Sequence, residues 1–304
     1  MKTNRYFAYM IMAAAVCACQ KENVAAPEAE GEFFTACIEQ PAPETKAMLE
    51  DGVKVAFQLN DKLRVTESTF SNKKDVKCTT GGSSGAMFSW NTGLAEAAGY
   101  YAVYKYQATV PAGSGFGAVC NLAKGAKKDG VQYEFEAQSN VFPIQIAVTG
   151  GFDPNVLGMV GKAGSDKVFR FSQMTSLLKF ELKKDGVAKI VLAALPTADA
   201  AAEYIGGRYS MQCLDEDNDG WFDKLLAGMS ADNQSSTITL LPPTGEATFP
   251  QGVYYIVTRP TRNCKGGISL TFHGSDDAVL KTVSNTEAVQ LNRGKIRFLG
   301  SFTW

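Results

Sequence analysis

Residues Tyr100–Tyr106 read YYAVYKY, the most strand-like run of the chain. Aromatic and β-branched side chains favour strands because they pack well on a pleated, half-buried surface. On both sides of this run, short alternating apolar and polar segments recur, and Gly, Asn, Asp and Pro turn signals separate them about every ten residues. The pattern predicts an all-β protein built of β-sandwiches.

The first of these segments is Phe33–Glu39 (FFTACIE), in which every second residue is apolar. Val53–Leu59 alternates in the same way after a turn signal. In the closing stretch, Lys295–Trp304, the side chains of Ile296, Phe298, Phe302 and Trp304 fall on one face. Because apolar residues alternate with polar ones in these segments, one face of each strand is expected to be buried. One short helix is also expected, at Ala198–Tyr204.

Length and composition fit two globular domains. The chain has 304 residues, is 45% hydrophobic and carries a formal net charge of −1. We expect an N-terminal β-sandwich at 32–150, a linker at 151–167 and a C-terminal β-sandwich at 168–304. The weak net charge offers no basic surface for nucleic acid, so none is expected as a partner.

The first 18 residues have the features of a secretory signal peptide. Lys2 and Arg5 precede the uncharged run Tyr6–Ala18, which is shorter than the ~20 apolar residues of a membrane-spanning helix. The run ends in small residues, as at a cleavage site.

The end of this segment, Val16-Cys17-Ala18-Cys19, resembles the lipobox of bacterial lipoproteins. The resemblance implies that Cys19 becomes a lipidated N-terminus, followed by a flexible polar tether at 19–31. The expected location is the cell surface, with the lipid in the outer membrane, or a fimbrium. The alternative is a plain signal peptide that is cut nearby and releases the chain.

Residue types for catalysis are sparse. His273 is the only histidine and lies where a strand is expected to enter a turn. After Cys17 and Cys19, five scattered cysteines remain and form no CxxC pair, which indicates buried thiols and neither a disulfide framework nor a zinc site. We therefore expect no enzymatic activity and no required cofactor.

One stretch has the spacing of a metal-binding loop. DEDNDGWFD, residues 215–223, places carboxylates at positions 1, 3, 5 and 9 of an EF-hand-type loop, with glycine at 6 and a carbonyl at 7. Leu226 stands at position 12, where the EF-hand has a bidentate Glu. The hypothesis is a weak calcium site that orders the loop; the alternative is an acidic turn whose side chains serve the backbone. The candidate ligands are Asp215, Asp217, Asp219, Trp221 and Asp223.

Four stretches, in this order, resemble the fimbrillin-like family, the type V pilins of Gram-negative anaerobes. They are TKAMLEDGVKVAFQLNDKLRV (Thr45–Val65), YYAVYKY (Tyr100–Tyr106), GGFDPNVLGMVGKA (Gly151–Ala163) followed by FRFSQMTSLLKFEL, and NRGKIRFLG (Asn292–Gly300). The resemblance implies two transthyretin-like β-sandwich domains in tandem. It also implies a fimbrial subunit, anchor or accessory protein that acts in adhesion.

The family also implies a mode of assembly. A protease cuts after a basic residue near the start, here matched by Lys46, and the first strand leaves a groove for a strand of another subunit. The donor would be the C-terminal strand Lys295–Trp304. Expected partners are other fimbrial subunits, the outer membrane through the lipid, and host or bacterial surface ligands. The alternative for Lys46 is an ordinary solvated lysine.

A rival function is a glycan- or protein-binding surface lipoprotein of a nutrient-uptake system. Exposed aromatic platforms would favour it, with Trp90 and Trp221 as the candidates.

Overall fold

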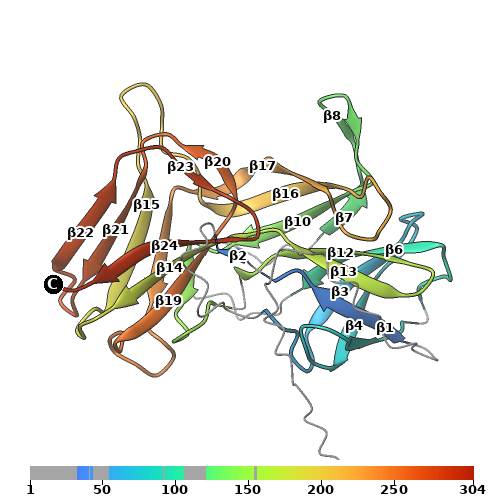
Figure 1. Ribbon diagram of the computed structural model, residues 1–304, viewed down its shortest axis with the longest axis horizontal. Coiled ribbons are helices and arrows are strands. Elements are labelled where there is room, and N and C mark those ends of the chain that lie inside the picture. The colour runs from blue at the N-terminus through green and yellow to red at the C-terminus, as the bar shows by residue number, and fades with distance from the viewer. Residues whose placement is uncertain (1–32, 41, 44–54, 92, 106–120, 154–155) are drawn as a thin grey trace, which may run out of the picture.

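The structure is a computed structural model that describes residues 33–40, 42–43, 55–91, 93–105, 121–153 and 156–304. The regular elements in this part of the chain are the strands β1 to β24 (Figure 1). The all-β class is thus confirmed. The helix expected at Ala198–Tyr204 is wrong, because these residues form an irregular connection between two strands. A segment of that length makes too few internal hydrogen bonds to be stable as a helix without packing.

The first unit is a closed barrel in which each strand pairs with two neighbours. In spatial order its strands are β1 (Phe33–Ile38), β13 (Val168–Gln173), β12 (Met159–Gly164), β6 (Gly99–Lys105), β3 (Lys62–Glu67), β4 (Lys73–Thr80) and β5 (Ala86–Ser89).

The barrel interior is filled by the inward half of each alternating strand. In β6 the side chains of Tyr100, Ala102 and Tyr104 lie in this core, whereas Tyr101 packs against the second one. The period of two in YYAVYKY thus lets one strand serve two cores.

The remaining sheets enclose the second core. They are β17 (Lys224–Ser235), β16 (Gly206–Leu214), β10 (Phe135–Val141) and β7 (Asn121–Lys124); β11 (Ile144–Ile146), β18 (Thr237–Leu241), β15 (Lys189–Ala194), β21 (Ile268–His273) and β22 (Val279–Asn285); β19 (Gly252–Thr258), β14 (Ser176–Leu182), β24 (Lys295–Phe302) and β2 (Ala42–Pro43); and the pairs β20 (Thr261–Cys264) with β23 (Val289–Leu291) and β8 (Lys127–Lys128) with β9 (Val131–Gln132).

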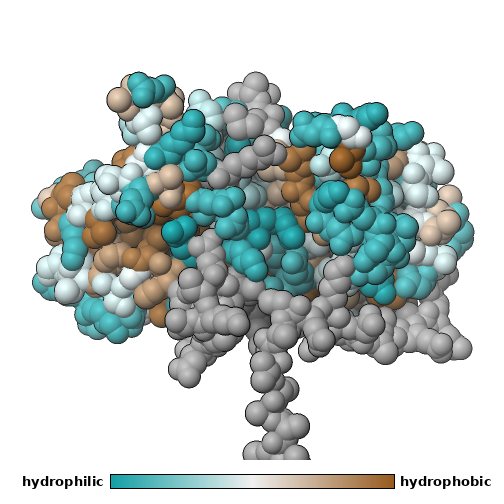
Figure 2. Space-filling view, turned by 45° about the horizontal axis from the view of Figure 1, so that its top comes forward, coloured by the Kyte–Doolittle hydropathy of each residue, from teal (hydrophilic) through white to brown (hydrophobic). Residues whose placement is uncertain are grey.

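Two of these sheets pack face to face through aromatic rings. Phe272 of β21 lies 6.5 Å from Phe180 of β14 and 5.1 Å from Phe302 of β24, measured between ring centroids. This half of the molecule therefore contains two sheets packed face to face as a sandwich. On the face drawn in Figure 2, apolar side chains gather at the left-hand end, where Figure 1 places β22 and β24.

The strand pairing crosses the expected domain boundary in both directions. The expected linker, 151–167, contains β12, which pairs with β6 and β13 inside the barrel. Conversely, β7 and β10 come before residue 150, but they pair with each other, and β10 pairs with β16 of the second unit. A boundary drawn from sequence cannot detect this, because strand patterns show which face is buried and not which strand lies alongside.

Candidate functional site

The acidic loop connects β16 to β17 as a hairpin closed by the pair Leu214 and Lys224. Asn218 and Gly220 have φ values of 58° and 89°, which fit Asn and Gly at the turn. Phe222 anchors the loop, since its ring is buried 5.2 Å from that of Phe135. Phe222 therefore fixes the C-terminal part of the loop, next to Asp223, to the second core.

Three of the four carboxylates expected to bind metal come together. Asp215, Asp217 and Asp223 each offer one oxygen atom, and these atoms all lie within 4.8 Å of one another. Asp219 is not in this group; one of its oxygens accepts a hydrogen bond of 2.8 Å from the backbone N–H of Trp221. Positions 1, 3 and 9 of the motif thus converge, while positions 5 and 7 share a turn.

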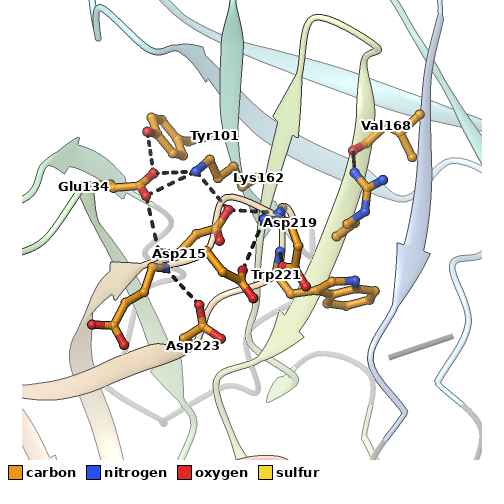
Figure 3. A network of polar contacts seen from close by, with 12 residues as sticks. Tyr101, Glu134, Lys162, Val168, Asp215, Asp219, Trp221 and Asp223 are labelled. Atoms are coloured by element: carbon orange, nitrogen blue, oxygen red, sulfur yellow. Dashed lines mark hydrogen bonds and ion pairs between the residues drawn. The ribbon is translucent and has the colours of Figure 1, made fainter. Parts of the chain in front are cut away.

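Asp215 differs from the other members because its side chain is completely buried. Its Oδ2 accepts hydrogen bonds of 2.9 Å from the Lys162 Nζ and from the backbone N–H of Gly220. Its Oδ1 is also buried and has no hydrogen-bond partner. Figure 3 shows the Asp215 carboxylate inside the bend of the loop.

A network of charged groups joins this loop to the barrel (Figure 3). Lys162 of β12 lies 3.0 Å from Glu134 as well as 2.9 Å from Asp215. Tyr101 of β6 donates a 2.8 Å hydrogen bond to Glu134, which also accepts the backbone N–H of Asp215 at 3.3 Å. The loop of the second unit is therefore held by two barrel strands.

The network shifts the protonation equilibria of its members. Burial by itself lowers the pKa of Lys162, but hydrogen bonds with Asp215 and Glu134 outweigh burial, so the pKa is raised. Burial, and then the hydrogen bond to Glu134, raises the pKa of Tyr101. Lys162 is therefore a stable cation and Tyr101 a stable donor at neutral pH.

Sequence reasoning missed Tyr101, Glu134 and Lys162. The only signal was the alternation of YYAVYKY, which turns Tyr101 away from the barrel interior while Tyr100 fills it. The pairing of Lys162 with Asp215 depends on tertiary contact, and no spacing in the sequence marks it.

Two other predicted site residues, Cys19 and Lys46, lie outside the described residues. The strand that a cut after Lys46 would release is described. β1 pairs in parallel with β13 and antiparallel with β5, and so completes the barrel. We call the space between β5 and β13 that β1 fills the β1 slot.

The β1 slot is lined by aromatic rings. Phe34 is completely buried, with its ring 4.9 Å from Phe169, 5.0 Å from Trp90 and 5.2 Å from Tyr100. The Nζ of Lys167 lies 4.1 Å from the centre of the Trp90 ring. Trp90 therefore packs against the first strand and is not a free aromatic platform.

The residues after β1 connect the barrel to the final strand. The carboxylate of Glu39 forms an ion pair with the guanidinium of Arg293, which precedes β24, at an N–O distance of 2.8 Å. The side chain of Gln173, at the end of β13, donates to the carbonyl of Glu39 at 3.0 Å. Immediately after, β2 pairs in parallel with β24. The segment from β1 to β2 thus contacts both the barrel and the second unit.

The histidine and the described cysteines, the residue types considered for catalysis, lie at strand ends or in the packed interior. His273 ends β21, as expected, and its Nδ1 lies 3.1 Å from the carbonyl of Asp277. Cys37, Cys78 and Cys213 are free thiols. Burial raises the pKa of Cys213 well above its ordinary value, so it stays protonated.

No family model and no curated protein matches the chain. Solved structures are similar to it. A candidate cell adhesion protein from Bacteroides uniformis is 10% identical, with 88% of this chain and 92% of that chain covered and a TM-score of 0.43. One from Bacteroides ovatus is 13% identical, with 88% and 91% covered and a TM-score of 0.44. A fimbrial protein from Bacteroides ovatus is 12% identical, with 90% and 51% covered and a TM-score of 0.30.

Among the described residues, no helix has the length and apolar character needed to cross a membrane.

Proposed function

We propose that the chain is a surface lipoprotein that forms, anchors or decorates a fimbrium and joins its neighbours by exchange of β-strands. The position of β1 carries this proposal. It is the first described strand of the chain, and it lies between β13 and β5 in the barrel wall.

Removal of β1 would create a site for another strand. The facing backbone groups of β5 and β13 would lose their partners, and the places of Phe34, Ala36 and Ile38 would become an empty apolar groove. An incoming strand with apolar residues at alternate positions would restore both the hydrogen bonds and the packing. The β1 slot is therefore suited to a strand from a second subunit.

A cut after Lys46 would detach β2 together with β1. The released segment includes Glu39, and its loss would remove the contacts with Arg293 and Gln173. It would also uncover the start of β24, where Lys295 and Ile296 pair with β2. The same cut would thus free an edge of the expected donor strand as well as the acceptor slot.

For the cleavage, we expect subunits purified from native fimbriae to begin at Ala47. A Lys46→Ala variant should keep the uncut N-terminus and fail to enter fimbriae, because β1 would continue to fill the barrel. N-terminal sequencing and electron microscopy measure these two outcomes. Lys77→Ala, an exposed lysine of β4, is the matched control and should be processed normally. Native material that begins only at Cys19 would contradict the cleavage.

For the lipid anchor, we expect labelled palmitate to be incorporated into the wild-type protein and lost in Cys19→Ala. The reason is that acylation requires the thiol of the residue that follows the cleavage site. Cys17→Ala removes the neighbouring thiol and should still be labelled. Equal labelling of wild type and Cys19→Ala would show that the chain is anchored by another route.

A further inference from the structure

We propose that the β16–β17 loop binds a calcium ion through Asp215 Oδ1, Asp217 and Asp223, and that the bound ion stabilises the junction between the barrel and the second unit. The proposal is independent of strand exchange. It combines the separation of the three carboxylates, the buried oxygen of Asp215 and the charge of its surroundings.

The first observation is distance. Calcium binds oxygen ligands at about 2.3–2.6 Å, so two ligands on one ion lie no more than about 5 Å apart. The oxygens offered by Asp215, Asp217 and Asp223 lie within 4.8 Å of one another. An ion placed among these atoms is therefore near all three carboxylates, and small side-chain movements would bring each oxygen to binding distance. Asp217 and Asp223 are exposed, which leaves room for water to complete the coordination.

The second observation points to a ligand independently of the acidic cluster. Asp215 Oδ1 is buried without a hydrogen-bond partner, in a side chain that has no solvent exposure. A buried carboxylate oxygen that accepts no hydrogen bond has lost its hydration without a direct replacement, even where the other oxygen of the same carboxylate is paired. Lys162 and the N–H of Gly220 both bind Oδ2. Oδ1 is therefore the atom that a metal ion would satisfy.

The third observation is charge. Carboxylates outnumber cations by three around the loop, when Lys162, Arg170 and Lys224 are set against Glu134, Asp215, Glu216, Asp217, Asp219 and Asp223. Arg170 is included because it packs against Gly220, where an added Cβ would lie 3.0 Å from its guanidinium. Like charges held together repel one another, and a divalent cation relieves most of this repulsion.

The donor set selects the type of ion. Every proposed ligand is an oxygen atom, and neither His nor Cys belongs to the described cluster. Hard oxygen ligands in a flexible hairpin suit calcium better than zinc or copper. Without the bidentate Glu of an EF-hand, we expect a dissociation constant of about 10⁻⁴–10⁻³ M, as in extracellular modules.

The stabilising effect follows from the two oxygens of Asp215. The proposed ion binds Oδ1, and Lys162 of β12 binds Oδ2 at 2.9 Å. An ion that fixes the loop therefore also fixes the carboxylate that holds the barrel strand. The effect of calcium should reach β12 as well as residues 215–223.

Calorimetric titration of the chelator-treated full chain with calcium chloride tests the site. We expect saturable binding by the wild type and at least tenfold weaker binding by Asp217→Ala, which alters an exposed side chain and should fold. Glu287→Ala removes an exposed carboxylate from another loop and should titrate like the wild type. An absence of saturable binding by the wild type, or identical titrations of wild type and Asp217→Ala, would overturn the site.

Hydrogen exchange tests the effect on the junction. With saturating calcium, amides of residues 215–223 and of β12 should exchange more slowly in the wild type, and neither group should change in Asp217→Ala. Slower exchange in the loop alone would keep the metal site and refute the stabilisation of the junction.

Discussion

Truncation of Phe34 to alanine is expected to lower the free energy of unfolding by about 3–5 kcal/mol. Phe34 is completely buried and is surrounded by the rings of Trp90, Tyr100 and Phe169. Its removal would leave a cavity in the middle of the β1 slot that the closed barrel cannot easily collapse to fill. The cost should therefore exceed that of most single substitutions.

Chemical denaturation measures this loss. The matched control is Phe298→Ala in β24, because the Phe298 side chain is 39% exposed; we expect a change within about 0.5 kcal/mol. If the two variants lost the same small amount of stability, β1 would not be a structural part of the barrel, and the strand-exchange proposal would lose its basis.

Replacement of Lys162 by methionine should cost a similar amount, about 3–5 kcal/mol. Methionine keeps most of the side-chain volume but removes the charge that lies between Asp215 and Glu134. The fully buried Asp215 would then lack its cation, and a buried charge without a partner is strongly unfavourable. Thermal and chemical unfolding in calcium-free buffer both measure the effect.

Two comparisons separate this explanation from a general loss of charge. Lys183→Met breaks a surface ion pair with Glu181, and we expect at most about 1 kcal/mol. Adding Asp215→Asn and Glu134→Gln to Lys162→Met removes the uncompensated charges and should recover much of the stability. A triple variant no more stable than Lys162→Met would show that packing, and not charge, explains the loss.

Much of the secondary structure could be predicted from the sequence because strand periodicity is a local property. The run YYAVYKY gave β6 to within one residue, and DEDNDGWFD was recognised as a loop with converging carboxylates. Closure of the barrel could not be predicted. It depends on parallel pairing between β1 and β13, two strands whose sequences show which faces are buried but not that they are neighbours.

In the candidate site, too, the sequence predicted what is local and missed what depends on tertiary contact. Motif spacing marked Asp215, Asp217 and Asp223, whose carboxylates lie close together in the structure, because residues of one short loop are close in sequence. It did not identify Lys162, which comes from β12 and meets Asp215 only in the folded chain. It also included Asp219, whose carboxylate accepts the backbone N–H of Trp221 in the turn.

The pairing of β1 with β13 also has a consequence for the order of folding. A ribosome makes β1 near the start of the chain, but its parallel neighbour β13 is complete only at Gln173. Contacts between such distant segments form slowly, and a nascent chain exposes apolar strands until they form. The barrel therefore cannot close while the first half of the polypeptide is being synthesised. During that interval β1 lacks its β13 neighbour and the contact of Phe34 with Phe169, so a holding chaperone would be most useful before residue 173 is available.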